Sequence, residues 1–105
     1  MLRVVQIEQR YTPLGEEEEK FEDFLNRVQT EIEKFGDQAH FLTEPGETYA
    51  LWVVAVQALD GLDAVIHAAK TLRTALMSAR MERYSWTFTT DLTKAREVDA
   101  AGAGF

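Results

Sequence analysis

The chain has 105 residues, enough for one domain with its own hydrophobic core, and it contains no cysteine, which excludes disulfide bonds and thiolate metal sites. Its net charge of −7 argues against nucleic-acid binding, because proteins of that class neutralise phosphates with Lys and Arg. The longest uncharged apolar run, residues 49–59, is far shorter than the roughly 20 apolar residues of a membrane helix, and we expect a cytoplasmic protein.

The first part of the chain predicts a strand followed by a helix. Residues 2–11 place Val5 and Ile7 on one face, as in a half-buried strand. From Glu16 onward, apolar residues recur at steps of three and four, as on one side of a helix. Gly36 is expected to end this helix, because glycine readily adopts the left-handed conformation that follows a last turn.

Two strands and a turn are predicted next, at residues 38–43 and 49–59. The second run, YALWVVAVQAL, is apolar on both faces, as expected of a strand in the middle of a sheet. Between the runs, Glu44–Glu47 has the residue order of a type II turn. If this turn closes a two-residue hairpin, His40 faces Leu51, and the hairpin has one apolar face and one mixed face.

A second helix and a fourth strand complete the predicted elements. Asp60 is the expected N-cap of the helix. Its predicted buried stripe is Leu62, Val65, Ile66, Ala69, Leu72, Leu76 and Ala79. Residues 83–90 alternate aromatic and polar side chains and predict the fourth strand. Asp91 is expected to cap a short helical turn that reaches Val98.

The order β-α-β-β-α-β most resembles the ferredoxin-like architecture, an α+β fold with a four-stranded antiparallel sheet and two helices on one face. The resemblance rests on element order and covers about residues 2–90. It implies the strand order 4-1-3-2, in which the run at residues 49–59 is central. We expect residues 1–90 to form the single domain, and residues 91–105 to form a C-terminal extension that ends in a flexible tail.

Few residues indicate catalysis. Ser78 and Ser85 lie outside any nucleophile-elbow pattern, and His40 and His67 lie outside the common metal-binding spacings. Asp63 is expected to pair with His67 one helical turn later. We therefore predict no catalytic residues, no metal site and no cofactor.

The acidic start of the first helix is a candidate surface for charge-based docking. Its residues are Glu16, Glu17, Glu18 and Glu19. They suit the basic groove of a partner protein. The alternative is that these acids complement the positive end of the helix dipole.

The sheet face away from the two helices is the second candidate surface. The mixed face of the predicted hairpin lies there, and its apolar patch is larger than a soluble monomer usually exposes. The candidate partner-binding residues are His40, Leu42, Tyr49, Leu51 and Val53. A second copy of the chain or the C-terminal segment is expected to cover them.

These features favour a non-catalytic protein-interaction domain that forms a homodimer through its open sheet face or a strand edge. One alternative is a small-molecule-binding protein or enzyme of the dimeric α+β barrel type, with His40, Tyr49 and Glu8 as the polar groups of an apolar pocket. The other is an acidic decoy that occupies a basic groove of a partner protein. Neither a membrane nor a nucleic acid is expected as a direct partner.

Overall fold

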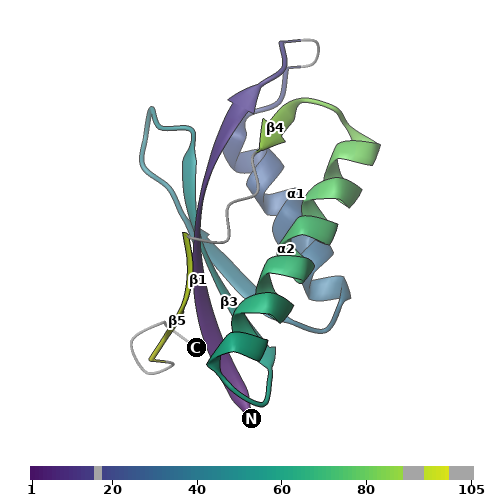
Figure 1. The fold of residues 1–105 in the computed structure, drawn as a ribbon. Helices are drawn as coiled ribbons and strands as arrows, with labels where there is room; N and C mark the ends of the chain where they lie inside the picture. Colours follow the sequence, from purple (N-terminus) through teal and green to yellow (C-terminus); the bar gives the residue numbers. More distant parts are fainter. Residues whose placement is uncertain (16–17, 89–93, 100–105) are drawn as a thin grey trace.

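The computed structural model describes residues 1–15, 18–88 and 94–99, and these residues form two helices and five strands. In chain order the elements are β1 (Leu2–Pro13), α1 (Phe21–Lys34), β2 (Gln38–Leu42), β3 (Tyr49–Gln57), α2 (Gly61–Glu82), β4 (Trp86–Phe88) and β5 (Ala95–Val98). The strand pairs are antiparallel, and both helices lie on one side of the sheet (Figure 1). The protein is thus an α+β fold. Neither helix in this described part is long and apolar enough to cross a membrane.

Strand β1 organises the sheet. It pairs with β3 along residues 2–10, with β5 along residues 4–7 and with β4 along residues 11–13. Strand β2 pairs with β3, so the order is β2-β3-β1-β4, with β5 also next to β1. The central position predicted for β3 is confirmed.

The end of the chain differs from the prediction. Residues 95–98 form a strand, so the predicted helical turn is wrong at these positions and the sheet has five strands, not four. The physical reason is that β4 pairs with only the end of β1. The backbone N–H and C=O groups nearer the start of β1 form their hydrogen bonds with β5 instead. Asp91, the predicted cap, lies outside the described residues.

The main core lies between the sheet and the helices. Its largest fully buried side chains include Trp52, Phe24, Leu25, Ile32 and Leu76. A buried chain of hydrogen bonds crosses it: the Trp52 indole donates to the Tyr11 hydroxyl at 2.8 Å, and that hydroxyl donates to the Gln9 side chain at 2.7 Å. Burial raises the pKa of Tyr11 more than the bond from Trp52 lowers it, so the phenol stays neutral.

The β2–β3 hairpin keeps its predicted faces in a different register. His40 pairs with Val53, not with Leu51. The turn at Glu44–Glu47 does form, closed by a backbone hydrogen bond of 3.1 Å, and its glycine has a φ of 82°. It lies within a longer loop, residues 43–48, because type II turns do not match the twist of a two-residue hairpin. The shift is two residues, so each side chain keeps its face.

Helix α1 begins at Phe21, later than the predicted start at Glu16. Two backbone carbonyl groups just before the helix accept hydrogen bonds from side chains much later in the chain. Arg83 donates to the carbonyl oxygen of Glu18, and Trp86 donates to the carbonyl oxygen of Glu19. The buried apolar stripe of the helix is Phe24, Leu25, Val28 and Ile32. The helix stop at Gly36 is confirmed, and this glycine has a φ of 86°.

Helix α2 begins as predicted, but only part of its predicted buried stripe faces the core: Leu72, Leu76 and Ala79 are buried as predicted. The Asp60 carboxylate accepts from the Asp63 amide at 2.8 Å, which confirms the N-cap. The core-facing residues are Ala64, Ala68, Thr71, Leu72, Ala75, Leu76 and Ala79. Leu62 and Ile66, predicted to be buried, are 72% and 42% exposed. The alanines let the helix backbone approach its neighbours closely, and Leu62 and Ile66 lie on the outward side of the helix.

Candidate functional site

The open sheet face, opposite the helices, is built of rows, because residues paired across antiparallel strands point to the same side. Starting near the β2–β3 loop, the rows are Leu42–Leu51–Glu8, His40–Val53–Gln6–Arg96 and Gln38–Ala55–Val4–Val98. Tyr49, paired with Arg10, lies one row closer to the loop. The sheet therefore brings all five candidate partner-binding residues onto one face, as expected.

The β5 side of this face forms a second, small hydrophobic cluster. Val4, Val53 and Ala55 are at most 2% exposed, and Val98 of β5 packs against them. Val53 thus belongs to a packed cluster and differs in this respect from the other four candidate residues.

The β2 side of the open face remains accessible. Leu42 is 58% exposed, and its direct cross-strand partner is the half-buried Leu51. His40 and Tyr49, on either side of this pair, are also half-buried. We call His40, Leu42, Tyr49 and Leu51 the outer patch.

Charged groups of both signs border the outer patch. The Arg10 guanidinium lies 5.7 Å from the centre of the Tyr49 ring, a cation–π distance. Partial burial raises the pKa of Tyr49, and the nearby Glu8 carboxylate, hydrogen-bonded to the phenol, raises it further. The hydroxyl is therefore a neutral donor beside one acid and one base.

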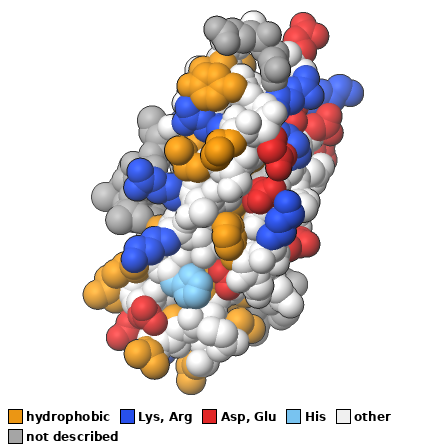
Figure 2. All heavy atoms as spheres, turned by 90° about the vertical axis from the view of Figure 1, so that its right-hand side faces the viewer, with side chains coloured by type: hydrophobic (Ala, Val, Ile, Leu, Met, Phe, Trp, Pro, Cys, Tyr) orange, Lys and Arg blue, Asp and Glu red, His pale blue; other side chains and the backbone are white. Residues whose placement is uncertain are grey.

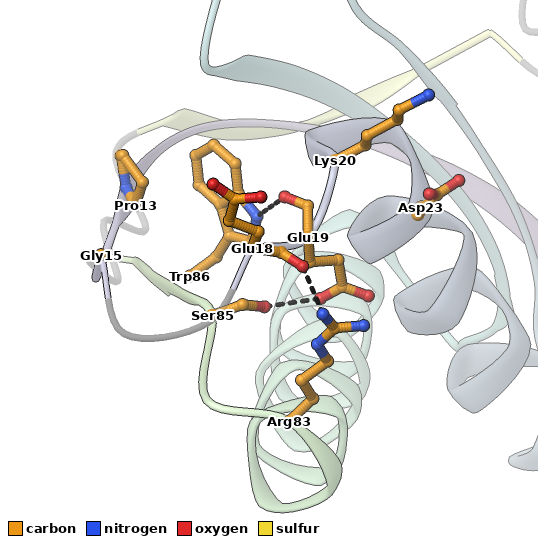
Figure 3. A pocket seen from close by; sticks show the side chains of 9 residues that line it. All are labelled: Pro13, Gly15, Glu18, Glu19, Lys20, Asp23, Arg83, Ser85 and Trp86. Carbon is orange, nitrogen blue, oxygen red and sulfur yellow. Dashed lines mark hydrogen bonds between the residues drawn. The ribbon is translucent and has the colours of Figure 1, made fainter.

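The four acids of the predicted docking surface have different environments. Glu16 and Glu17 lie outside the described residues. Glu18 has an exposed side chain. Glu19 has a side chain only 5% exposed, and it points into a cluster of polar groups between α1 and β4 (Figure 3).

Both oxygens of the Glu19 carboxylate are bound. Arg27 donates to each of them at 2.7 Å, and the Ser85 hydroxyl donates to Oε1 at 2.5 Å. Burial favours the neutral acid, but the hydrogen bonds from Arg27 and Ser85 and the charges of Arg27 and Arg83 outweigh it, so the pKa of Glu19 is lowered. We call Glu19, Arg27 and Ser85 the Glu19 clamp.

The clamp joins segments that are far apart in the chain. Arg27, on α1, also donates to the carbonyl oxygen of Ala79 on α2 at 2.7 Å. The amide of Leu14, just after β1, donates to the carbonyl oxygen of Ser85 at 3.0 Å. The clamp therefore holds the start of α1 against the end of α2 and the residue just before β4.

A cavity of about 620 Å³ lies beside the clamp (Figure 3). Lys20, Asp23 and Arg83 contribute to its wall together with Trp86, whose indole donates to the Glu19 carbonyl oxygen at 3.0 Å. The Ser85 hydroxyl, which belongs to a residue that also lines the cavity, donates to the Glu19 carboxylate. The arrangement ties α1 to the end of α2 and to the segment before β4.

His67 has a different acid partner from the predicted one. The Asp63 carboxylate accepts from the Leu59 amide at 2.9 Å and so is engaged at the start of α2. The Nε2 atom of His67 lies 3.3 Å from Oδ2 of Asp37, which also accepts from the Thr71 hydroxyl at 3.0 Å. These residues line a depression of about 260 Å³, and Asp37 ties the α1–β2 connection to α2.

Among residues 1–15, 18–88 and 94–99, no group of three or more His, Cys, Asp or Glu side chains is placed to hold a metal ion. Comparisons with protein-family models, with curated proteins and with solved structures find no match for this chain. The function is therefore inferred from the residues of the chain itself.

Sequence reasoning missed the Glu19 clamp. Glu19 and Arg27 are eight residues apart, twice the spacing at which ion pairs are sought on a helix, and Ser85 is on a remote segment. No local signal distinguishes Glu19 from the other three glutamates.

Proposed function

We propose that this protein is a non-catalytic interaction domain that forms a homodimer through the outer patch. The observation that carries the proposal is the cross-strand pair of Leu42 and Leu51 on a sheet face without helices, with Leu42 58% exposed. Removing apolar surface from water favours association by about 25 cal/mol per Å². The outer patch thus offers a driving force for association that the monomer leaves unused.

The borders of the patch suit pairing with a second copy. A two-fold symmetric interface must complement itself. Glu8 and Arg10 lie on the same face, beside Leu51 and Tyr49 respectively, so each copy offers the partner one acid and one base. Stable interfaces bury about 20–30 residues a side, which is more than this patch, so we expect a weak dimer that dissociates in the micromolar range.

The test is a dilution series followed by two-dimensional ¹⁵N–¹H NMR, from about 1 mM to about 10 μM, the range of weak complexes. We expect concentration-dependent amide shifts concentrated in β2 and the first half of β3. The variant Leu42→Asp should remove these shifts, because it adds a negative charge to the outer patch of each copy, and the two charges would repel each other across the interface. Leu59→Asp is the matched control, since Leu59 is 90% exposed at the start of α2. Shifts that persist in Leu42→Asp, or that are absent in the wild type, contradict the proposal.

A small-molecule site of the dimeric α+β barrel type is the second candidate. It is favoured by the hydrogen bond between Tyr49 and Glu8, which places polar groups at the border of an apolar surface. An apolar fluorescent dye would then bind the wild-type dimer with saturation and would not bind the Leu42→Asp variant. Equal dye binding by both proteins argues against this site.

The decoy function has less support. The Glu19 carboxylate is held inside the clamp, so of the two described acids Glu18 alone presents an exposed side chain. Replacing Glu18 by Gln tests the function directly. A decoy surface would lose affinity for a basic partner protein, whereas a solvated acid would leave that affinity unchanged.

We also propose that the fold is a variant of the ferredoxin-like architecture. In support, β4 and β5 pair with successive parts of β1 on the side away from β3, where a single fourth strand would lie. A cytoplasmic location is likewise proposed, and the lack of cysteine is compatible with a reducing compartment.

A further inference from the structure

The outward side of α2 carries a line of large apolar side chains. Leu62 and Ile66 are 72% and 42% exposed near the start of the helix, and Met77 and Met81 are 46% and 87% exposed near its end. At 100° per residue these positions fall on one side of the helix, opposite the core-facing alanines. Exposing so many large apolar side chains is unusual where the same helix buries alanine.

Two cations separate the apolar groups. Lys70 and Arg73 are exposed on the same side, midway along the helix, and neither forms an ion pair with another residue of the described part of the chain. We call Leu62, Ile66, Lys70, Arg73, Met77 and Met81 the α2 stripe. Figure 2 turns the helical layer toward the viewer and shows hydrophobic side chains in separate groups, with Lys and Arg among them and Asp and Glu on the same face.

The acids of α2 lie near its two ends, away from Lys70 and Arg73. Asp63, at the start of the helix, accepts from the Leu59 amide, and Glu82, at its end, lies 3.5 Å from Arg27 of α1. Arg80, near the end of the stripe, donates to the Tyr84 hydroxyl at 2.7 Å. In the middle of the stripe, a protein with a net charge of −7 thus presents two cations between apolar side chains.

The order of apolar and charged side chains along the stripe indicates which kind of partner would bind it. From Leu62 to Met81 the helix rises about 28 Å at 1.5 Å per residue, with apolar groups at both ends and cations in the middle. A membrane surface is a poor match, since burying both ends would draw Lys70 and Arg73 toward the hydrocarbon layer. A second α2 packed antiparallel is also disfavoured, because the cations of both copies would meet.

We propose that the α2 stripe binds an acidic amphipathic helix of another protein, with apolar side chains near both ends and carboxylates between them. Apolar side chains of that helix contact the two ends of the stripe, and its carboxylates pair with Lys70 and Arg73. This surface is separate from the outer patch, so the inference goes beyond the proposed homodimer.

The experiment uses two synthetic peptides of about 20 residues, enough to span the stripe. Both carry Leu near each end, and the central residues are Glu in one and Lys in the other. By fluorescence anisotropy we expect the Glu peptide to bind the full chain at least about tenfold more tightly than the Lys peptide, a difference of about 1.4 kcal/mol. In the double variant Lys70→Glu, Arg73→Glu this preference should reverse.

Controls separate this result from the outer patch and from misfolding. Leu62→Ser should weaken binding of the Glu peptide, whereas Leu42→Asp should leave it unchanged. Circular dichroism confirms that the charge-reversed variant is folded, as expected for exposed positions. Equal affinity for both peptides, no binding up to about 1 mM, or binding to phosphatidylserine vesicles without binding to the Glu peptide overturns the inference.

Discussion

Glu19 is one of four consecutive glutamates, yet its environment makes it part of the framework of the protein. Its side chain is 5% exposed, and its charge is balanced by two hydrogen bonds from Arg27 and one from Ser85. A carboxylate that is withdrawn from water requires such partners. Nothing in the local sequence distinguishes it from Glu18, because the distinction arises only when the ends of α2 and β1 meet.

Replacing Glu19 by Gln should lower the free energy of unfolding by about 2–4 kcal/mol, because Arg27 and Ser85 lose a charged acceptor in a largely buried place. Urea unfolding measures the change. Glu22→Gln, an exposed acid in the first turn of α1, is the matched control and should cost less than about 1 kcal/mol. Equal losses for the two variants would show that the clamp contributes no more than a surface acid.

The clamp also predicts how stability depends on pH. The pKa of Glu19 is lower in the folded chain than in the unfolded one, so its contribution is present above the unfolded pKa of about 4.3 and is lost as the pH falls through the folded pKa. Urea unfolding between about pH 7 and pH 2 should therefore show the wild type and Glu19→Gln converging in acid. A difference that stays constant to pH 2 would contradict the lowered pKa.

At the scale of elements, α2 shows where the spacing of apolar residues predicts the wrong buried side chains. Large and small apolar residues occur on both sides of this helix, and the usual rule places the larger ones inside. Here Ala64, Ala68, Ala75 and Ala79 face the core, because the helix packs closely. Their small volume is informative only once the distance between α2 and its neighbours is known.

Two leucines of α2 give a direct test of this orientation. Leu76→Ala should cost about 2–5 kcal/mol of unfolding free energy, because Leu76 is fully buried and its truncation leaves a cavity. Leu62→Ala should change stability by less than about 0.5 kcal/mol, since its side chain is mostly in water. Thermal or urea unfolding of both variants measures the two losses of stability. Comparable losses would show that Leu62 is buried, as the sequence pattern predicted.

The strands differ in how much of them was predictable. The alternation in β1 and the apolar run of β3 placed their core-facing side chains correctly, since burial on one or both faces leaves a clear pattern. Strand β5 has only four residues, too few for alternation to be recognised. The hairpin register was missed because it depends on the length of the loop, whereas the faces depend only on odd or even position.

At the scale of the whole molecule, the sequence predicted two helices on one face of an antiparallel sheet and a candidate surface on the other. The five residues named for that surface do share a face, but Val53 packs with Val4, Ala55 and Val98 of β5, the strand beside β1. This packing depends in part on a strand from the end of the chain. It reduces the predicted patch to the half that borders β2.

Sedimentation velocity at increasing protein concentration tests the central claim most directly. If the outer patch forms a homodimer, the wild type should shift from the mass of one chain toward that of two across the micromolar range, and Leu42→Asp should remain a monomer throughout. A wild-type protein that stays monomeric at high micromolar concentration, or a Leu42→Asp variant that dimerises equally well, would contradict it.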